Sequence, residues 1–137
     1  MQIEPYSDAH FGGVETLWQA VFPNDPPRNQ AASSIPQKLE VGDGLFWVAL
    51  GPDQDVIGTI MAGWDGHRGW LYSVAVADRQ RRSGVGKALV ETALEALKER
   101  GCKKVNLQIR AGNENVAAFY ESLGFSLEPR TSMGREI

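Results

Sequence analysis

The most informative stretch of this chain is Arg79-Gln80-Arg81-Arg82-Ser83-Gly84-Val85-Gly86-Lys87. It follows an apolar run and opens an amphipathic pattern that is typical of a helix. The N-terminus of a helix presents N–H groups without helical partners and a partial positive charge, which together favour an anion. Gly84 and Gly86 lack side chains, so backbone amides can approach phosphate oxygens, and three arginines add formal charge. The stretch therefore predicts a site for a pyrophosphate.

Two common phosphate motifs do not fit this stretch. G-x-x-x-x-G-K-[S/T] fails because Ala88 stands where Ser or Thr is needed, and G-x-G-x-x-G fails because Leu89 occupies its last position. The pattern [Q/R]-x-x-G-x-[G/A] is met by Arg81, Gly84 and Gly86. A different kind of nucleotide-binding protein that uses the arginines for phosphate stays open as an alternative.

Length and composition point to one domain over residues 1–137, since domains usually hold about 100–200 residues. The single cysteine, Cys102, excludes an internal disulfide framework and a multi-cysteine metal site, and it fits a reducing cytoplasm. Neither a leader pattern nor a membrane-length apolar run is present, so we expect no membrane partner.

The net charge of −3 hides an asymmetry along the chain. Residues 1–68 hold three basic and nine acidic residues, whereas residues 69–137 hold eleven basic and eight acidic ones. A nucleic-acid binder is usually basic overall, so we expect no nucleic-acid partner. A small anion bound by the second half and a cationic partner attracted by the first are compatible with this division, as is an uneven scatter of solvated charge.

Hydrophobic periodicity predicts a mixed α/β domain. Four helices are expected: over residues 8–21, over 31–40, from the end of the glycine-containing stretch to about residue 100, and over 114–123. Pro36 marks a place where the second of them could break. The expected strands cover residues 2–6, 45–50, 56–64, 70–76, 104–110, 125–129 and 131–137. The order is β-α-α-β-β-β-α-β-α-β-β, with about six to seven strands in one central sheet and four helices.

Two blocks of the chain together resemble the GNAT superfamily of acetyl-CoA-dependent N-acetyltransferases. VAVADRQRRSGVGKALV is similar to the central strand–loop–helix motif of that superfamily, and NLQIRAGNENVAAFYESLGF to its next strand–helix motif. WDGHRGWLY and RTSMGREI further resemble a small bacterial branch, the YpeA-like acetyltransferases. The resemblance covers nearly the whole chain and implies the GNAT fold.

The resemblance implies where acetyl-CoA would bind. The strand before the phosphate loop carries a bulge in the family and separates from the strand after the helix, and the pantetheine arm of the cofactor bonds backbone groups in that gap. Here those groups belong to Val74, Ala75 and Val76. An amide at this point can also polarise the thioester carbonyl. The phosphates would be held by Arg81, Arg82, Ser83, Gly84, Val85, Gly86 and Lys87.

The second block holds three candidate site residues, and two of them, Asn113 and Tyr120, have two interpretations each. Asn113 and Asn115 match positions that bind the pantetheine or pyrophosphate arm in the family, while Asn113 is equally suited to cap the following helix. Tyr120 matches the family's general acid, which would protonate the departing thiolate, or it is a core aromatic on the face shared with Val116 and Leu123. Proton donation from an unperturbed phenol to a thiolate is uphill by about 2 kcal/mol.

A general base is not identified by the sequence. Relatives that acetylate protein N-termini often carry Glu where this chain has Gln108, and an amide cannot act as a base. The remaining candidates are Asp65, His67, Glu4, or a water relayed through Tyr72 or Ser73.

The function implied by the resemblance is transfer of an acetyl group from acetyl-CoA to a primary amine by direct attack in a ternary complex, with no metal. Trp18, Phe22, the proline-containing loop after it and Trp64 are candidates for lining the acceptor pocket. Dimers are common in the family, so a homodimer is one expected assembly. The alternative within the same fold is a weakly catalytic sensor or regulatory module that binds acyl-CoA.

Overall fold

A five-stranded mixed sheet carries the fold, and the computed structural model describes all 137 residues. The sheet lies in the first of two compact units, residues 1–107 and 108–137. Its strands are β1 (Gln2–Pro5), β2 (Phe46–Leu50), β3 (Val56–Trp64), β4 (Gly69–Val76) and β5 (Val105–Asn106), in that spatial order. The first four pair antiparallel and β5 pairs parallel to β4, so the predicted α/β class and the mixed sheet are confirmed.

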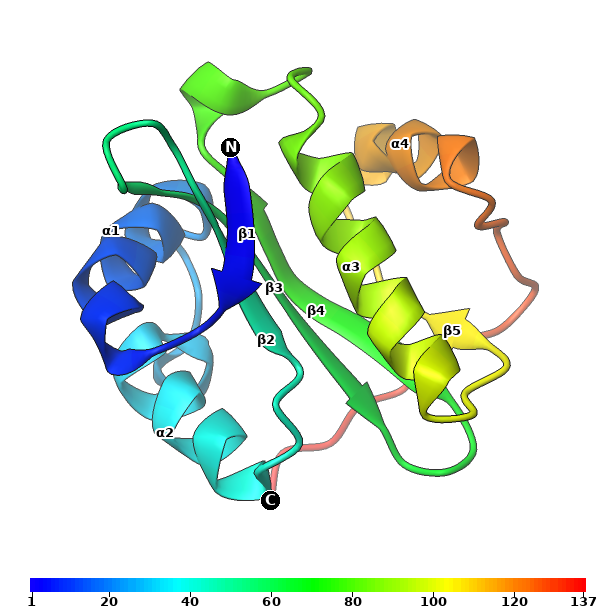
Figure 1. Cartoon of the computed structure of the whole chain (residues 1–137). Coiled ribbons are helices and arrows are strands. Elements are labelled where there is room, and N and C mark those ends of the chain that lie inside the picture. The colour runs from blue at the N-terminus through cyan, green and yellow to red at the C-terminus, as the bar shows by residue number, and fades with distance from the viewer. The chain divides into compact units, whose positions relative to one another are not determined.

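Helices cover both faces of this sheet (Figure 1). Helices α1 (Phe11–Val21) and α2 (Ala31–Val41) pack on one face, and α3 (Val85–Glu99) packs on the other. The apolar face predicted for α3 is confirmed, because its fully buried side chains recur at helical spacing: Leu89, Val90, Ala93 and Leu97. The predicted first helix begins one turn late, after a 3₁₀ turn over Asp8–His10, and α2 continues through Pro36 without a break.

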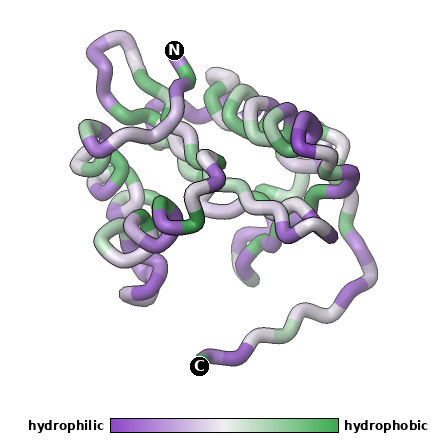
Figure 2. The backbone as a smooth tube through the Cα atoms, turned by 60° about the horizontal axis from the view of Figure 1, so that its bottom comes forward, coloured by the Kyte–Doolittle hydropathy of each residue, from purple (hydrophilic) through white to green (hydrophobic).

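The second unit has less regular structure than the sequence suggests. It contains a 3₁₀ turn (Glu114–Val116) followed by α4 (Ala117–Ser122). The prediction of strands at 125–129 and 131–137 is wrong, and the strand predicted over 104–110 shortens to β5. Beyond residue 125 every side chain is exposed, so no alternating apolar face exists to be buried against a sheet. Figure 2 shows this C-terminal tail as an extended trace of mostly hydrophilic or neutral colour.

The C-terminal ends of α3 and α4 use the same glycine-dependent cap. Gly101 has φ +95°, and the following amide, that of Cys102, bonds back to the carbonyl of Leu97 at 3.1 Å. At the end of α4, Gly124 has φ +95° and the amide of Phe125 bonds the carbonyl of Tyr120 at 3.1 Å. These are Schellman caps, and they satisfy carbonyls that the helix leaves without partners. No helix of the structure is both long and apolar enough to cross a bilayer.

A buried ammonium group joins α2 to the sheet. The side chain of Lys38 is only 6% exposed, and its Nζ donates to Asp43 Oδ2 at 2.9 Å, to the carbonyl oxygen of Ala62 and to the hydroxyl of Tyr72 at 3.1 Å. The three donors of the ammonium are thereby all used, which compensates for its removal from water. Asp43 also accepts the amide of Leu45, so one carboxylate holds both the lysine and the start of β2.

We predict that Asp43→Asn destabilises the protein because the Lys38 ammonium loses its only counter-ion while it stays buried. Asp43 retains some exposure, so we expect a loss of about 2 kcal/mol in the free energy of unfolding, below that of a fully buried pair. Urea denaturation monitored by tryptophan fluorescence measures it. The matched control is Glu40→Gln, which replaces an exposed acid on α2, the helix that carries Lys38, and should change the free energy by less than about 0.5 kcal/mol. Equal stability of the two variants would show that the buried pair contributes nothing.

Candidate active site

The predicted phosphate loop is a short irregular segment between β4 and α3. It contains a 3₁₀ turn (Asp78–Gln80), after which Arg82 and Gly84 both adopt left-handed backbone angles, φ +65° and +88°. The first helical amide to bond a backbone carbonyl is that of Ala88, to Gly84 at 3.0 Å. The amides at positions 85–87 therefore belong to the helix turn whose donors have no helical acceptor. A side chain at Gly84, the residue directly before these amides, would meet no atom within 4 Å, so the space beside Gly84 is open.

The loop's cations differ in what they contact. Arg79 pairs with Asp55, Arg81 Nε lies 3.1 Å from Asp78, and Lys87 Nζ lies 3.9 Å from Glu91. Arg82 makes no ion pair and is exposed. Exposed ion pairs are worth little, so an incoming anion can compete for the paired cations, but Arg82 is available without such competition. The open amides and this cation fit the diphosphate of a CoA-type molecule.

Strand β4 departs from regular pairing where the sequence predicts a bulge. Thr59 pairs with Ala75 and Met61 with Tyr72, so Ser73 and Val74 together face a single residue of β3. Ser73 has φ +51°, which is left-handed and costly for a residue other than glycine. The expected bulge is therefore present.

The other side of β4 is largely without a strand partner. Pairing with β5 is limited to Gly69 with Val105 and Trp70 with Asn106. From Leu71 to Val76 the backbone has no pairing on that side, which leaves an edge along the residues predicted to bond the pantetheine arm. The open edge and the phosphate loop are consecutive in the chain, so one extended ligand can follow both.

The second unit contains Asn113, Asn115 and Tyr120. Asn113 stands at the N-cap position of the 3₁₀ turn but makes no side-chain capping bond, so the capping interpretation is not supported. Both carboxylate oxygens of Glu114 accept the amide of Gly112 at 3.0 Å, which holds the pKa of Glu114 below its usual range. Tyr120 contacts Phe125 edge-on, with ring centroids 5.8 Å apart, and is partly buried. That burial raises the pKa of Tyr120, so the phenol stays protonated at neutral pH.

The candidate bases have structural duties. Asp65 Oδ1 accepts the amides of His67 at 2.8 Å and Arg68 at 2.9 Å, and these bonds lower the pKa of Asp65 and weaken it as a base. His67 is exposed in this turn. Glu4 Oε1 lies 3.0 Å from His10 Nε2.

Gln108, which stands where some relatives carry Glu, uses its side-chain amide to donate to Ser132 Oγ at 2.6 Å. Among the candidates named from the sequence, Asp65 and Glu4 are held by their hydrogen bonds, whereas His67 and a water relayed through Tyr72 or Ser73 stay candidates for the base.

The structure gives Trp18 and Thr59 surroundings that the sequence does not predict. Trp18 is 4% exposed and belongs to the core, so it is a poor candidate for the wall of an acceptor pocket. Its Nε1 donates to the hydroxyl of Thr59 at 2.8 Å. The sequence pattern gives Thr59 no role, and its only signal is a polar residue inside the apolar run of β3.

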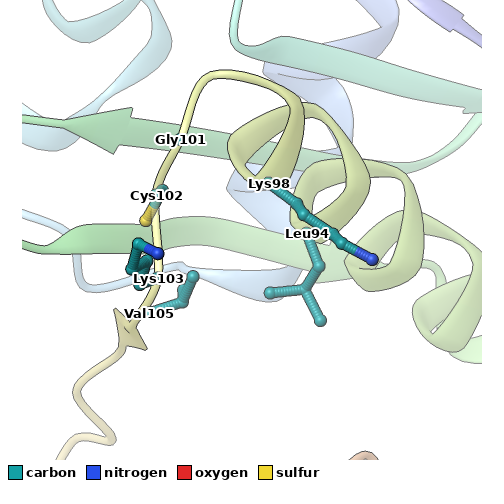
Figure 3. Close-up of a pocket in the computed structure, with 6 residues that line it drawn as sticks. All are labelled: Leu94, Lys98, Gly101, Cys102, Lys103 and Val105. Atoms are coloured by element: carbon teal, nitrogen blue, oxygen red, sulfur yellow. The ribbon is translucent and has the colours of Figure 1, made fainter.

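A surface hollow of about 500 Å³ lies at the far end of α3 from the phosphate loop (Figure 3). Its lining residues come from the last turns of α3 and the segment leading into β5: Leu94, Lys98, Gly101, Cys102, Lys103 and Val105. Since α3 rises about 1.5 Å per residue over its 15 residues, this hollow is about 20 Å from Gly84. Cys102 is a buried thiol that donates to the carbonyl oxygen of Lys104 at 3.3 Å. The hollow is separate from the predicted cofactor site.

Comparison with known proteins agrees with this geometry. The family model described as "Acetyltransferase (GNAT) family" matches residues 12–125. The chain is 35% identical over 128 residues to the acetyltransferase SG1711 of Sodalis glossinidius (strain morsitans), covering 93% of this chain and 89% of that protein.

Solved structures share the fold at lower identity. The aminoglycoside antibiotic 6'-N-acetyltransferase AAC(6')-IG from Acinetobacter haemolyticus superposes with a TM-score of 0.76 at 23% identity, covering 100% of this chain and 99% of that one. AAC(6')-Iy, in complex with the bisubstrate analogue CoA-S-monomethyl-acetylneamine, gives a TM-score of 0.81 at 18% identity, covering 99% of this chain and 97% of that one.

The fold and the loop thus define an acyltransferase. More particularly, the chain belongs to the GNAT acetyltransferase family, as its resemblance indicates. The match crosses the boundary between the two structural units, so both contain family sequence.

We predict that Tyr120 ionises above pH 10, because burial favours its neutral form. Its contribution to stability is then complete below about pH 10 and is lost as the pH rises through the higher folded-state pKa. Absorbance of the phenolates near 295 nm measures the titration, and Tyr120→Phe should remove one component with a midpoint above 10. Removal of a component with a midpoint at or below 10 would contradict the prediction.

Proposed function

We propose that the protein transfers an acetyl group from acetyl-CoA to a primary amine of a small molecule, a peptide or a protein, by direct attack in a ternary complex. The proposal is supported by three features that follow one another along the chain. Strand β4 is bulged and has no partner strand on one side, Gly84 is left-handed, and the first turn of α3 has amides without helical acceptors. A bisubstrate analogue that joins CoA to an amine acceptor is named for one structural neighbour. We take residues 1–137 as one domain, since the family match spans both units.

Each group of predicted residues has a distinct task in this proposal. The backbones of Val74, Ala75 and Val76 bond the pantetheine arm along the open edge of β4. The diphosphate lies against the loop and the first turn of α3, made by Arg81, Arg82, Ser83, Gly84, Val85, Gly86 and Lys87. Asn113 and Asn115 add polar contacts to the same molecule, and Asn113 has no capping bond that would compete.

The chemistry needs one proton removed and one delivered. When bound, acetyl-CoA supplies an activated thioester carbonyl and a thiolate leaving group. The neutral Tyr120 holds the proton that the leaving thiolate takes, and its raised pKa makes full transfer more uphill than for a free phenol. We therefore propose that Tyr120 donates a hydrogen bond that becomes proton transfer only as the carbon–sulfur bond breaks. The amine loses its proton to His67 or to a water relayed through Tyr72 or Ser73, the candidates that no carboxylate contact competes with.

The alternative is an acyl-CoA-binding sensor of the same fold. It is favoured by Gln108, which replaces a carboxylate found in some relatives and is engaged with Ser132. The cytoplasmic location, the homodimer, the absence of a metal and the bacterial source stay predictions.

We predict that Arg82→Gln weakens CoA binding by about five- to tenfold, because Arg82 is the loop cation without an acidic partner. The affinity of the variant for CoA should also depend less on salt concentration than that of the wild type, since one ionic contact is lost. Titration calorimetry with CoA at two salt concentrations measures both effects. Arg135→Gln, an exposed arginine in the C-terminal tail, is the charge-matched control and should bind CoA like the wild type.

We further predict that the protein releases thiol from acetyl-CoA in the presence of at least one primary amine. A panel of neamine, glucosamine 6-phosphate, lysine and a peptide with a free N-terminus covers aminosugar, side-chain and α-amines. Free thiol is detected with a disulfide reagent, and mass spectrometry of the amine confirms acetylation. Tight CoA binding without turnover on any amine supports the sensor, whereas stabilisation by ATP or NAD and none by CoA would overturn both readings.

A further inference from the structure

A buried hydroxyl group fixes the backbone of the β4 bulge. Thr59 on β3 has no exposed surface, and its Oγ1 lies 2.8 Å from Nε1 of Trp18 and 2.9 Å from the carbonyl oxygen of Ser73. The indole N–H can only donate and the carbonyl can only accept, so the single hydroxyl proton must go to Ser73. The chain of bonds therefore runs in one direction, from α1 through β3 to β4.

The contact acts on the residue whose backbone is least favourable. Ser73 is left-handed at φ +51°, and neither it nor Val74 has an in-register partner on β3. A non-glycine residue adopts this conformation only where its surroundings hold it. The hydrogen bond from Thr59 is the side-chain contact on the Ser73 carbonyl that can do so.

The same bond sets the direction of the next amide. A trans peptide is planar, and its carbonyl and N–H point in opposite directions. With the Ser73 carbonyl directed at Thr59, the N–H of Val74 is directed away from it, on the opposite side of the peptide. This amide has no ladder partner in β3, so it is available to a ligand along β4.

We propose that Thr59 and Trp18 are positioning residues for acetyl transfer, because they hold the Ser73–Val74 peptide so that the Val74 N–H faces the carbonyl oxygen of the bound acetyl group. The inference rests on the proposed function. Neither side chain touches substrate; both act through the Ser73 carbonyl. An aimed N–H matters most where negative charge develops on that oxygen during attack, so the effect falls on turnover rather than on CoA affinity.

The test compares Thr59→Val with Thr59→Ser in the full chain. Valine keeps the shape of threonine but removes the hydroxyl, and it leaves the Trp18 N–H and the Ser73 carbonyl buried without their partner. Serine keeps the hydroxyl and removes a methyl group. We expect Thr59→Val to lower kcat with the best amine of the panel at least tenfold, with the Kd for CoA changed less than threefold, and Thr59→Ser to stay within threefold of the wild type in both.

Backbone chemical shifts of Ser73 and Val74 provide a readout that does not depend on activity. In Thr59→Val the Ser73 shifts should leave the values of a left-handed residue, and in Thr59→Ser they should stay. A folded Thr59→Val protein with a kcat less than tenfold reduced, or with unchanged Ser73 shifts, would overturn the inference. All measurements are made well below the unfolding midpoint of each variant, so that lost stability is not counted as lost turnover.

Trp18→Phe is the second variant and decides the matter if Thr59→Val does not fold. It keeps an aromatic ring in the core and removes the donor to Thr59 together with part of the buried indole, which frees the hydroxyl to rotate. We expect kcat to fall at least fivefold, and a smaller fall would overturn the inference. If wild-type protein neither binds CoA nor releases thiol, the proposed function fails instead, while the chemical shifts still report whether Thr59 holds the bulge.

Discussion

The hydrogen bond from Thr59 to the Ser73 carbonyl is the contact on which the geometry of β4 depends. It interrupts the ladder between β3 and β4 at one peptide, while pairing continues on both sides of that point. The half of β4 that follows the bulge has no partner on the β5 side and leads directly into the phosphate loop.

The core accepts two polar insertions on the face covered by α1 and α2. Lys38 donates to the hydroxyl of Tyr72 on β4 and to the carbonyl oxygen of Ala62 on β3. Thr59 donates to the carbonyl oxygen of Ser73, the next residue of β4, where the bulge lies. Apolar side chains would fill these positions without desolvating a charge or a hydroxyl. Both insertions are fully hydrogen-bonded, so their effect is directional: they fix β4 relative to β3 in a way that dispersion contacts cannot.

Much of this fold can be predicted from local patterns in the sequence. The apolar spacing of Leu89, Ala93 and Leu97 defines α3, and glycines at 101 and 124 define where two helices end. The phosphate loop was predictable too, since its glycines and arginines are contiguous. Contacts between distant residues are not visible in this way: Trp18 and Thr59 are 41 positions apart, and a threonine in a strand has an ordinary β-propensity.

In the C-terminal tail, by contrast, the sequence predicts strands that do not form, because a few apolar residues there suggest them. Strand formation depends on a partner and on a face to bury, and here the residues beyond 125 are exposed and include Pro129 and Gly134. The ion pair of Arg79 with Asp55 could not be predicted from local sequence either, because it joins the loop to a turn 24 positions earlier.

Cys102 occupies the position after the left-handed Gly101, where a Schellman cap needs an apolar side chain, and its sulfur packs too closely to Gly69 to leave room for a methyl group there. Oxidation to a sulfenic acid would add an oxygen atom to this tight contact, so the side chain would have to move toward the surface hollow that it also lines. Glycine at position 69 and a small side chain at position 102 are thus two parts of one packing arrangement at the junction of α3 and β5.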